Sequence, residues 1–146
     1  QNNAFFWNEF AIGGARLWDT DEFCFDAYIE YRENPKAKIS DKHPSSEETE
    51  KIFQRELLRL ETSLKMLEAK ARPDQIRIAM THYPPIGAEL HASRAAAILE
   101  KYKISVCVFG HLHNVIPGSI PFGIKNGVKY VITACDAVEC VPVRIV

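Results

Sequence analysis

Apolar residues recur at alternating steps of four and three through the middle of the chain. The stripe consists of Phe53, Leu57, Leu60, Leu64, Leu67 and Ala71. This spacing keeps one face of an α-helix apolar, and Ser45 with Glu48 three positions later is a capping-box signature. We therefore predict one helix over residues 47–71, ending before Pro73, with its stripe buried against a sheet. A coiled-coil dimer is the competing interpretation of the same stripe.

Two shorter runs have the composition of buried β-strands. Residues 76–81 alternate apolar and non-apolar side chains and end at a pair of prolines, whereas residues 104–109 are mostly β-branched or apolar and end at Gly110. Between them, residues 93–102 predict a helix. A strand, a helix and a strand with short joins predict a βαβ unit, whose strands are parallel neighbours.

The two ends of the chain predict further strand material. Residues 4–31 are rich in aromatic side chains, interrupted by a glycine pair at 13–14 that predicts a tight turn or a close backbone approach. Residues 128–134 and 138–146 predict two closing strands, and the charged residues 32–46 predict a loop. The pattern as a whole predicts an α/β protein with a mixed sheet and flanking helices.

Composition narrows the class of protein without identifying it. The length of 146 residues suits one domain, and a hydrophobic fraction of 47% is ordinary for a globular core. Eighteen basic and nineteen acidic side chains give a net charge of −1, whereas a nucleic-acid-binding surface usually shows a basic excess. No apolar run approaches the ~18–20 residues that span a bilayer, so we expect no membrane span.

The cysteines show no sign of a structural zinc site. Cys24, Cys107, Cys135 and Cys140 have no C-x-x-C spacing. Cys107 lies inside a predicted buried strand, where a free thiol acts as a small apolar side chain. We expect reduced cysteines in a cytoplasmic protein, and a Cys135–Cys140 disulfide is the alternative.

Histidines stand where both strands of the predicted βαβ unit end. His82 follows residues 76–81, and His111 and His113 follow residues 104–109. In an extended backbone, residues two apart project to the same side, and neutral imidazole is the commonest side-chain ligand for divalent transition metals. Because parallel strands end at the same edge, we predict that the three imidazoles converge on metal; the alternative is three polar loop residues.

Two segments carry a resemblance to a known family. Thr-His-Tyr-Pro-Pro at 81–85 followed by Phe-Gly-His-Leu-His at 109–113 resembles the last two metal-ligand motifs of the calcineurin-like metallophosphoesterases. The resemblance implies that His82 and His111 bind one divalent ion and that His113 binds a second, with Mn, Fe or Zn as the metals. It also implies a four-layer α/β/β/α sandwich and hydrolysis of a phosphate ester by water activated at a dinuclear metal site.

The chain departs from the family in its first three motifs, which are Asp-x-His, Gly-Asp with a bridging carboxylate, and Gly-Asn-His. No Gly-Asp or Gly-Asn dipeptide occurs in the 146 residues, and Asp-Lys-His at 41–43 follows a charged stretch where the family has a buried strand. We therefore interpret residues 41–43 as a solvated loop. We expect residues 1–146 to be the carboxyl-terminal portion of a metallophosphoesterase domain, with the remaining metal ligands and the catalytic acid in a missing amino-terminal half.

A missing half has consequences for stability and activity. Its removal would expose apolar side chains of the strands at 76–81 and 104–109, so self-association through that sheet face is expected. The chain alone is expected to be inactive and to contain no catalytic residue besides metal ligands.

Several other polar residues have weaker patterns. Arg16 and Trp18 are candidates for the phosphate site, although a core tryptophan and a surface ion pair are the favoured interpretation. His91 either faces substrate above the metals or lies in a surface loop, which we favour. The aspartates at 19, 21 and 26 show no ligand spacing and are expected to be solvated.

Three other classes of protein were compared with the sequence pattern. A non-catalytic, protein-binding scaffold with a metallophosphoesterase-like sheet is the main alternative, but a scaffold has no need of three convergent histidines. A metallo-β-lactamase-like hydrolase requires an Asp where Val115 stands. A cupin-like His-x-His site belongs to all-β surroundings, which the predicted helix at 93–102 contradicts.

Overall fold

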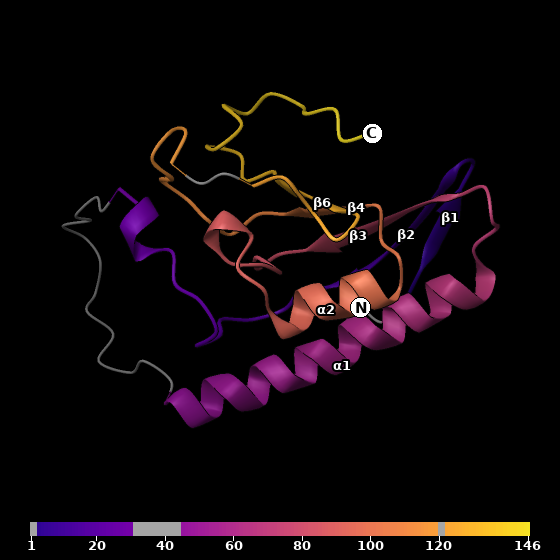
Figure 1. Ribbon diagram of the computed structural model, residues 1–146, viewed down its shortest axis with the longest axis horizontal. Coiled ribbons are helices and arrows are strands. Elements are labelled where there is room, and N and C mark those ends of the chain that lie inside the picture. The colour runs from indigo at the N-terminus through magenta and orange to yellow at the C-terminus, as the bar shows by residue number, and fades with distance from the viewer. Residues whose placement is uncertain (1–2, 31–44, 120–121) are drawn as a thin grey trace.

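The computed structural model of the protein describes residues 3–30, 45–119 and 122–146 (Figure 1). The elements are β1 (Phe5–Trp7), β2 (Phe10–Ala15), the 3-10 helix η1 (Asp26–Tyr28), α1 (Ser46–Lys70), β3 (Ile76–Thr81), the 3-10 helix η2 (Ala88–Leu90), α2 (Arg94–Lys101), β4 (Val106–Phe109), β5 (Ile124–Lys125) and β6 (Val128–Ile132). Most of the loop predicted at 32–46, including the Asp-Lys-His at 41–43, lies outside these described residues.

The strands of the described chain form one mixed sheet in the order β1-β2-β3-β4-β6-β5. β2, β3, β4 and β6 run parallel, and β1 and β5 pair antiparallel to their neighbours at the two edges. The predicted βαβ unit is present, because α2 connects the adjacent parallel strands β3 and β4. Both helices lie on one side of the sheet (Figure 1). The expected α/β class with a mixed sheet and flanking helices is confirmed.

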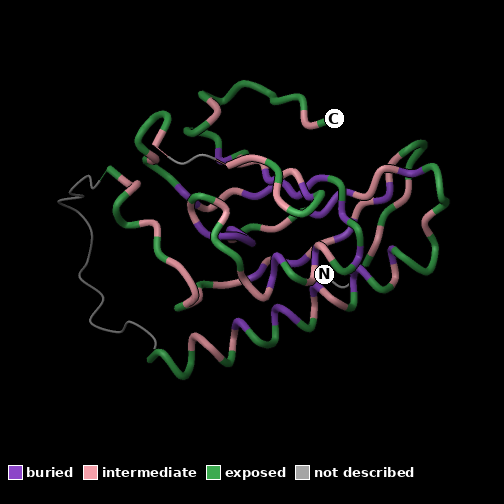
Figure 2. The backbone as a smooth tube through the Cα atoms, viewed as in Figure 1, coloured by how far each residue is buried: buried purple, intermediate pink, exposed green. Residues whose placement is uncertain are grey.

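Helix α1 forms close to the predicted bounds. Both hydrogen bonds of the predicted capping box are made, between the Ser45 side chain and the Glu48 backbone and between the Glu48 side chain and the Ser45 backbone. The predicted stripe from Phe53 to Leu67 is at most 7% exposed and packs over β2 and α2 (Figure 2). Since this face is occupied within the chain, it does not serve a coiled-coil partner.

The glycine pair lies inside β2, and each glycine permits a close approach. A side chain at Gly13 would meet Ser63 Oγ at 3.0 Å and Leu64 at 3.2 Å, so this glycine lets α1 approach the sheet. Gly14 has φ +153°, and a Cβ there would lie 1.9 Å from the Met80 carbonyl oxygen of β3. The Gly14 N–H also donates to Ser63 Oγ over 2.9 Å. The close-approach interpretation is therefore confirmed, and the tight turn is wrong.

Two sequence-based assignments near the chain ends were wrong, and one hairpin was missed. The aromatic segment around Phe25 contains η1 and no strand. Residues 138–146 form no strand, because positive φ angles at Glu139 and Cys140 turn the backbone away from an extended path. The β5–β6 hairpin was missed although Asn126-Gly127 is a two-residue hairpin signal; both residues have the positive φ that such a turn requires.

The two faces of the sheet differ in what covers them. Ala11, Ala79 and Cys107 alternate with residues of the other face and belong to the core beneath the helices. On the opposite face Val106 is 5% exposed, but Met80 is 53% exposed. The expected exposure of the strands at 76–81 and 104–109 is thus found at Met80, whereas Val106 and its neighbours are buried. Figure 1 shows the C-terminal segment running on this side of the sheet.

Two further expectations concern redox state and membranes. All four cysteines are free, so the alternative Cys135–Cys140 disulfide is not formed. Among the described residues, no helix is long and apolar enough to cross a membrane.

Candidate metal centre

The candidate site lies where β3 and β4 end. Thr81 pairs with Phe109 in the parallel ladder, so the two strands end level with each other. His82 directly follows β3, and its carbonyl accepts a hydrogen bond from the Gly110 N–H over 3.2 Å. The structure therefore places His82 and His111 in two adjoining loops at the carboxyl edge of the sheet.

The imidazoles of His82 and His111 face each other. His82 Nε2 and His111 Nδ1 are 3.2 Å apart. Two ligand nitrogens that each lie ~2.1 Å from one ion, about 100° apart as seen from it, are separated by about this distance. Both nitrogens can therefore donate lone pairs to one cation placed between them.

The loop after β4 is not extended. The sequence argument that His111 and His113 project to the same side assumed an extended backbone, so it does not apply here. His111 has φ +67°, and the Leu112 N–H donates to the Gly110 carbonyl over 2.8 Å in a tight turn. This turn directs His111 toward His82. The imidazole of His113 instead lies beside Asp136, with Nδ1 2.9 Å from Oδ1.

Burial favours the neutral form of His111, which is the form that binds metal. Partial burial lowers the pKa of its imidazole, and the carboxylate of Asp19, 3.9 Å from Nε2, opposes that shift. A neutral imidazole offers the lone pair that a cation needs. Asp19 is exposed, as expected from the sequence, but its position beside His111 was not predicted by the sequence spacing.

Aromatic rings form one wall of the site. The Tyr83 ring lies 4.0 Å from that of His111 and 5.2 Å from that of Trp18, and the Arg16 guanidinium stacks over Trp18 at 4.4 Å. Desolvation raises the pKa of Tyr83 above its usual value. Beside His111 is a cavity of about 300 Å³, whose lining includes Trp18, Asp19, Phe23, Phe25, Tyr83 and Leu112.

The alternatives for Arg16 and Trp18 are thereby revised. Trp18 packs against the core and also lines the cavity. Within the described part of the chain Arg16 makes no ion pair, and its buried Nε has no hydrogen-bond partner. Its guanidinium lies over Trp18, and its backbone carbonyl accepts the N–H groups of His82 and Tyr83. The expected surface ion pair is wrong.

A second polar cluster lies at the end of β6. Asp136 Oδ2 accepts the Asn114 N–H over 2.7 Å, and this bond together with His113 lowers the pKa of the Asp136 carboxyl. Ligand atoms of His113, Cys135 and Asp136 lie within 4.8 Å of one another. Sequence reasoning missed Asp136, although it follows a predicted strand that turns out to neighbour β4.

Residues 3–115 match the family model of the calcineurin-like phosphoesterases. The chain belongs to this family. The matched segment contains His82, His111 and His113 and ends before β5 and β6. No curated protein matches the chain.

Membership of the calcineurin-like phosphoesterases supports a metal-dependent hydrolase that acts on phosphate esters, because enzymes of this family use divalent metals. The paired imidazoles of His82 and His111 fit such a metal by the chemistry of their donor atoms. The family model, like the sequence motifs, supports this activity without identifying a substrate.

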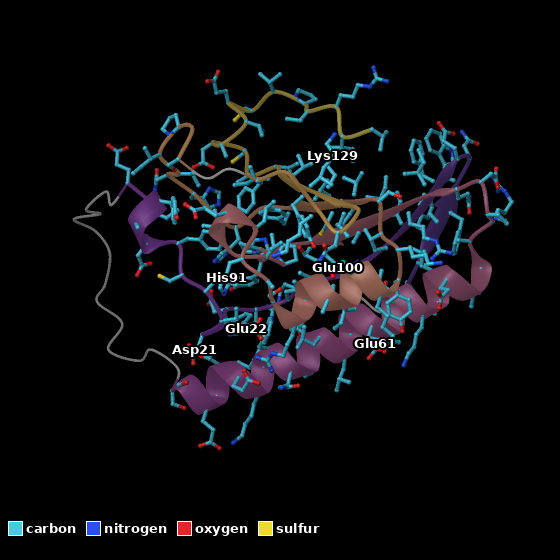
Figure 3. All side chains as sticks on the ribbon, in the orientation of Figure 1. Asp21, Glu22, Glu61, His91, Glu100 and Lys129 are labelled. Carbon is cyan, nitrogen blue, oxygen red and sulfur yellow. The ribbon has the colours of Figure 1, made fainter. Side chains whose placement is uncertain are left out.

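Other candidate residues lie apart from the imidazole pair. His91 is exposed in the loop that follows η2, as favoured from the sequence. Asp21 accepts a hydrogen bond from the Ser46 hydroxyl over 2.6 Å at the start of α1, and Figure 3 shows it beside Glu22 near that end of the helix. Neither residue lines the cavity beside His111.

Proposed function

We propose that this chain contributes one edge of a dinuclear metal centre that hydrolyses a phosphate ester. His82 and His111 would hold one divalent ion, and His113 would hold the second. The observation that carries the proposal is the 3.2 Å separation of His82 Nε2 and His111 Nδ1. Mn, Fe and Zn are the candidate ions, since imidazole suits metals of this kind.

The chain's own residues would prepare the site for such chemistry. When bound, two divalent ions supply charge neutralisation for the phosphoryl group and lower the pKa of the attacking water. Partial burial lowers the pKa of His111 and so favours its neutral form, and the tilted Tyr83 ring packs against its imidazole with the ring centroids 4.0 Å apart. The aromatic cavity beside His111 is positioned to take part of the substrate next to the phosphate.

We further propose that the remaining ligands, including a bridging carboxylate, come from outside residues 1–146. Three imidazoles satisfy only part of the coordination of two ions, and the sequence contains no Gly-Asp or Gly-Asn motif. The chain alone would therefore bind metal weakly and turn over no phosphate ester. A partner segment that carries the missing ligands would restore both properties.

The competing function is a protein-binding scaffold without catalysis. Its sheet would be the same, but the convergence of His82 and His111 would then serve no purpose. Metal binding separates the two functions, because a scaffold has no reason to hold a cation between these rings.

The test is calorimetric titration of the chain with Mn²⁺ and Zn²⁺, together with assays of a generic aryl phosphate monoester and diester. We expect measurable metal binding that is lost in His111→Ala and retained in the matched control His91→Ala, whose imidazole is exposed elsewhere. Equal binding by wild type and His111→Ala would favour the scaffold. Turnover by the chain alone would contradict the proposal that further ligands are needed.

A further inference from the structure

The carboxylate of Asp136 is held between a ring nitrogen of His113 and the backbone N–H of Asn114, at the edge of the proposed metal centre. Its Oδ1 lies 2.9 Å from His113 Nδ1, and its Oδ2 accepts the Asn114 N–H over 2.7 Å. β4 and β6 are parallel neighbours in which Phe109 pairs with Ile132. His113 and Asp136 each follow the last paired residue of their strand by four positions, so both loops deliver their side chains to one place.

The contact with Asp136 determines which nitrogen of His113 carries its proton. An ionised carboxylate only accepts hydrogen bonds, so Nδ1 of His113 must donate. A neutral ring with its proton on Nδ1 has its free lone pair on Nε2. In metal sites generally, a carboxylate behind a histidine fixes ring orientation and tautomer in this way.

We propose that Asp136 is a positioning residue that holds His113 in the Nδ1–H tautomer, with Nε2 directed at the metal. The inference deepens the proposed function and rests on it. Asp136 lies beyond residues 3–115, so the family match assigns it no role. The Asn114 N–H contributes the second anchor, which prevents the carboxylate from rotating away from His113.

Direct metal binding by this cluster is the competing arrangement. Ligand atoms of His113, Cys135 and Asp136 lie within 4.8 Å of one another, and imidazole, thiolate and carboxylate together suit zinc. However, an ion held there would have to displace the hydrogen bond between His113 and Asp136. Both carboxylate oxygens already have N–H partners, which favours the positioning role.

Asp136→Asn tests the tautomer directly. The backbone N–H of Asn114 can only donate, so the new amide would turn its oxygen to Asn114 and its NH₂ toward His113 Nδ1. His113 Nδ1 must then accept, which moves the ring proton to Nε2 and blocks the metal-binding atom. The matched control is Asp74→Asn, since Asp74 is exposed and bonds to Arg72 before β3, at the opposite end of the sheet.

The primary measurement is long-range proton–nitrogen NMR of the His113 ring in metal-free protein at mildly alkaline pH, where imidazole is neutral. We expect Nδ1–H in the wild type and in Asp74→Asn, and Nε2–H in Asp136→Asn. In calorimetric titration, Asp136→Asn should bind the Mn²⁺ ion that His113 contacts about 10–100-fold more weakly than the wild type does. Loss of packing alone would not move the ring proton from one nitrogen to the other.

The proposal would be overturned by a wild-type His113 protonated on Nε2, or by an Asp136→Asn variant with an unchanged tautomer. A thiolate-to-Co²⁺ absorption band that disappears in Cys135→Ser would also overturn it, because that cluster would then bind metal directly. The expected tautomers without any Mn²⁺ binding by the wild type would support the positioning role while contradicting the proposed metal-dependent function.

Discussion

At the scale of single residues, the pairing of His82 with His111 depends on one unusual backbone angle. His111 has φ +67°, a left-handed conformation that costs a non-glycine residue on the order of 1 kcal/mol or more. Strained residues of this kind persist where the surroundings over-determine them, and they cluster at functional sites. Here the conformation turns the imidazole toward His82, which an extended continuation of β4 would not do.

Because His82 and His111 would share one ion, their contributions to metal binding should not add. We expect His82→Ala and His111→Ala each to weaken Mn²⁺ binding by at least about tenfold. The double variant should bind Mn²⁺ as tightly as the single variant with the lower affinity. Calorimetry on the four proteins measures this coupling. Independent, additive losses would mean that the two rings bind separate ions, and no loss in either variant would mean that they bind none.

Gly14 is required by the backbone of β3. Its φ is +153°, and a Cβ at this position would lie 1.9 Å from the Met80 carbonyl oxygen, which leaves no space for a side chain. We expect Gly14→Ala to lower the free energy of unfolding by about 2–3 kcal/mol in urea denaturation. Gly123→Ala is the control, because nothing lies within 4 Å of a side chain there. Equal effects of the two substitutions would contradict the close-approach argument.

At the scale of elements, an arginine at the first turn of α2 ties the two helices together. Arg94 donates from Nη1 and Nη2 to both carboxylate oxygens of Glu50 on α1, over 2.7 and 2.9 Å, and also bonds to Glu22. The Arg94 hydrogen bonds lower the pKa of Glu50 to about 2. The ionised carboxylate therefore favours the folded state.

The sign of the pH dependence follows from that lowered pKa. The contribution of Glu50 is complete above its ordinary value of 4.5 and is lost as the pH falls from there through about 2. We expect Glu50→Gln to lower the free energy of unfolding near neutral pH by on the order of 0.5–1 kcal/mol, because both side chains are about two-fifths exposed and solvent screens the pair. The difference from wild type should shrink as the pH falls from 4.5 and disappear below about pH 2.

The control for this prediction is Glu47→Gln, because Glu47 and its i,i+4 partner Lys51 are both largely exposed. Chemical denaturation at several pH values measures all three proteins. A Glu50→Gln difference that stays constant as the pH falls would show that lost packing, and not lost charge, explains it.

Elements with a clear periodicity were predictable from the sequence, and elements defined by backbone turns were less so. The stripe and capping box predicted α1, and the two apolar runs predicted β3 and β4 with a parallel pairing. Residues 138–146 have apolar character without a neighbouring strand to pair with, which no local pattern reveals. The β5–β6 hairpin was present in the sequence as Asn126-Gly127 but was overlooked.

The candidate site was predictable where its residues follow strands with a clear pattern, and not where they lie in irregular segments. His82 and His111 follow strands whose adjacency the βαβ pattern already implies. Asp136 could not be assigned without knowing that β6 lies next to β4, since this pairing joins segments between which residues 110–127, including β5, intervene in the sequence. Asp19 lies beside His111 but belongs to an irregular segment. The sequence has no hydrophobic periodicity there from which this position could be predicted.

At the scale of the whole molecule, the sheet has a partly uncovered face. The strand registers place Phe5, Trp7 and Met80 on the side away from α1, and these side chains are 53–62% exposed. Exposed apolar surface of this kind marks interaction sites or promotes association. We propose that this apolar patch of Phe5, Trp7 and Met80 is where the chain self-associates when no other segment covers it.

Self-association through the patch is testable by sedimentation equilibrium. We expect the wild type to form concentration-dependent dimers or larger species, and Met80→Lys to weaken that association by at least about tenfold, since a buried lysine charge is costly. Leu58→Lys is the matched control, because Leu58 is also well exposed but lies on α1 on the other side of the molecule. A monomeric wild type, or equal effects of the two variants, would contradict this role of the patch.

The most direct test of the proposed metal centre is anomalous X-ray diffraction from crystals of the chain soaked in Mn²⁺. The proposed function predicts an anomalous peak between His82 Nε2 and His111 Nδ1, roughly 2.1–2.3 Å from each nitrogen, and no such peak in crystals of His111→Ala. Ordered crystals that bind Mn²⁺ only elsewhere, or that show the same peak without the His111 imidazole, would contradict the claim that these two histidines hold a catalytic metal.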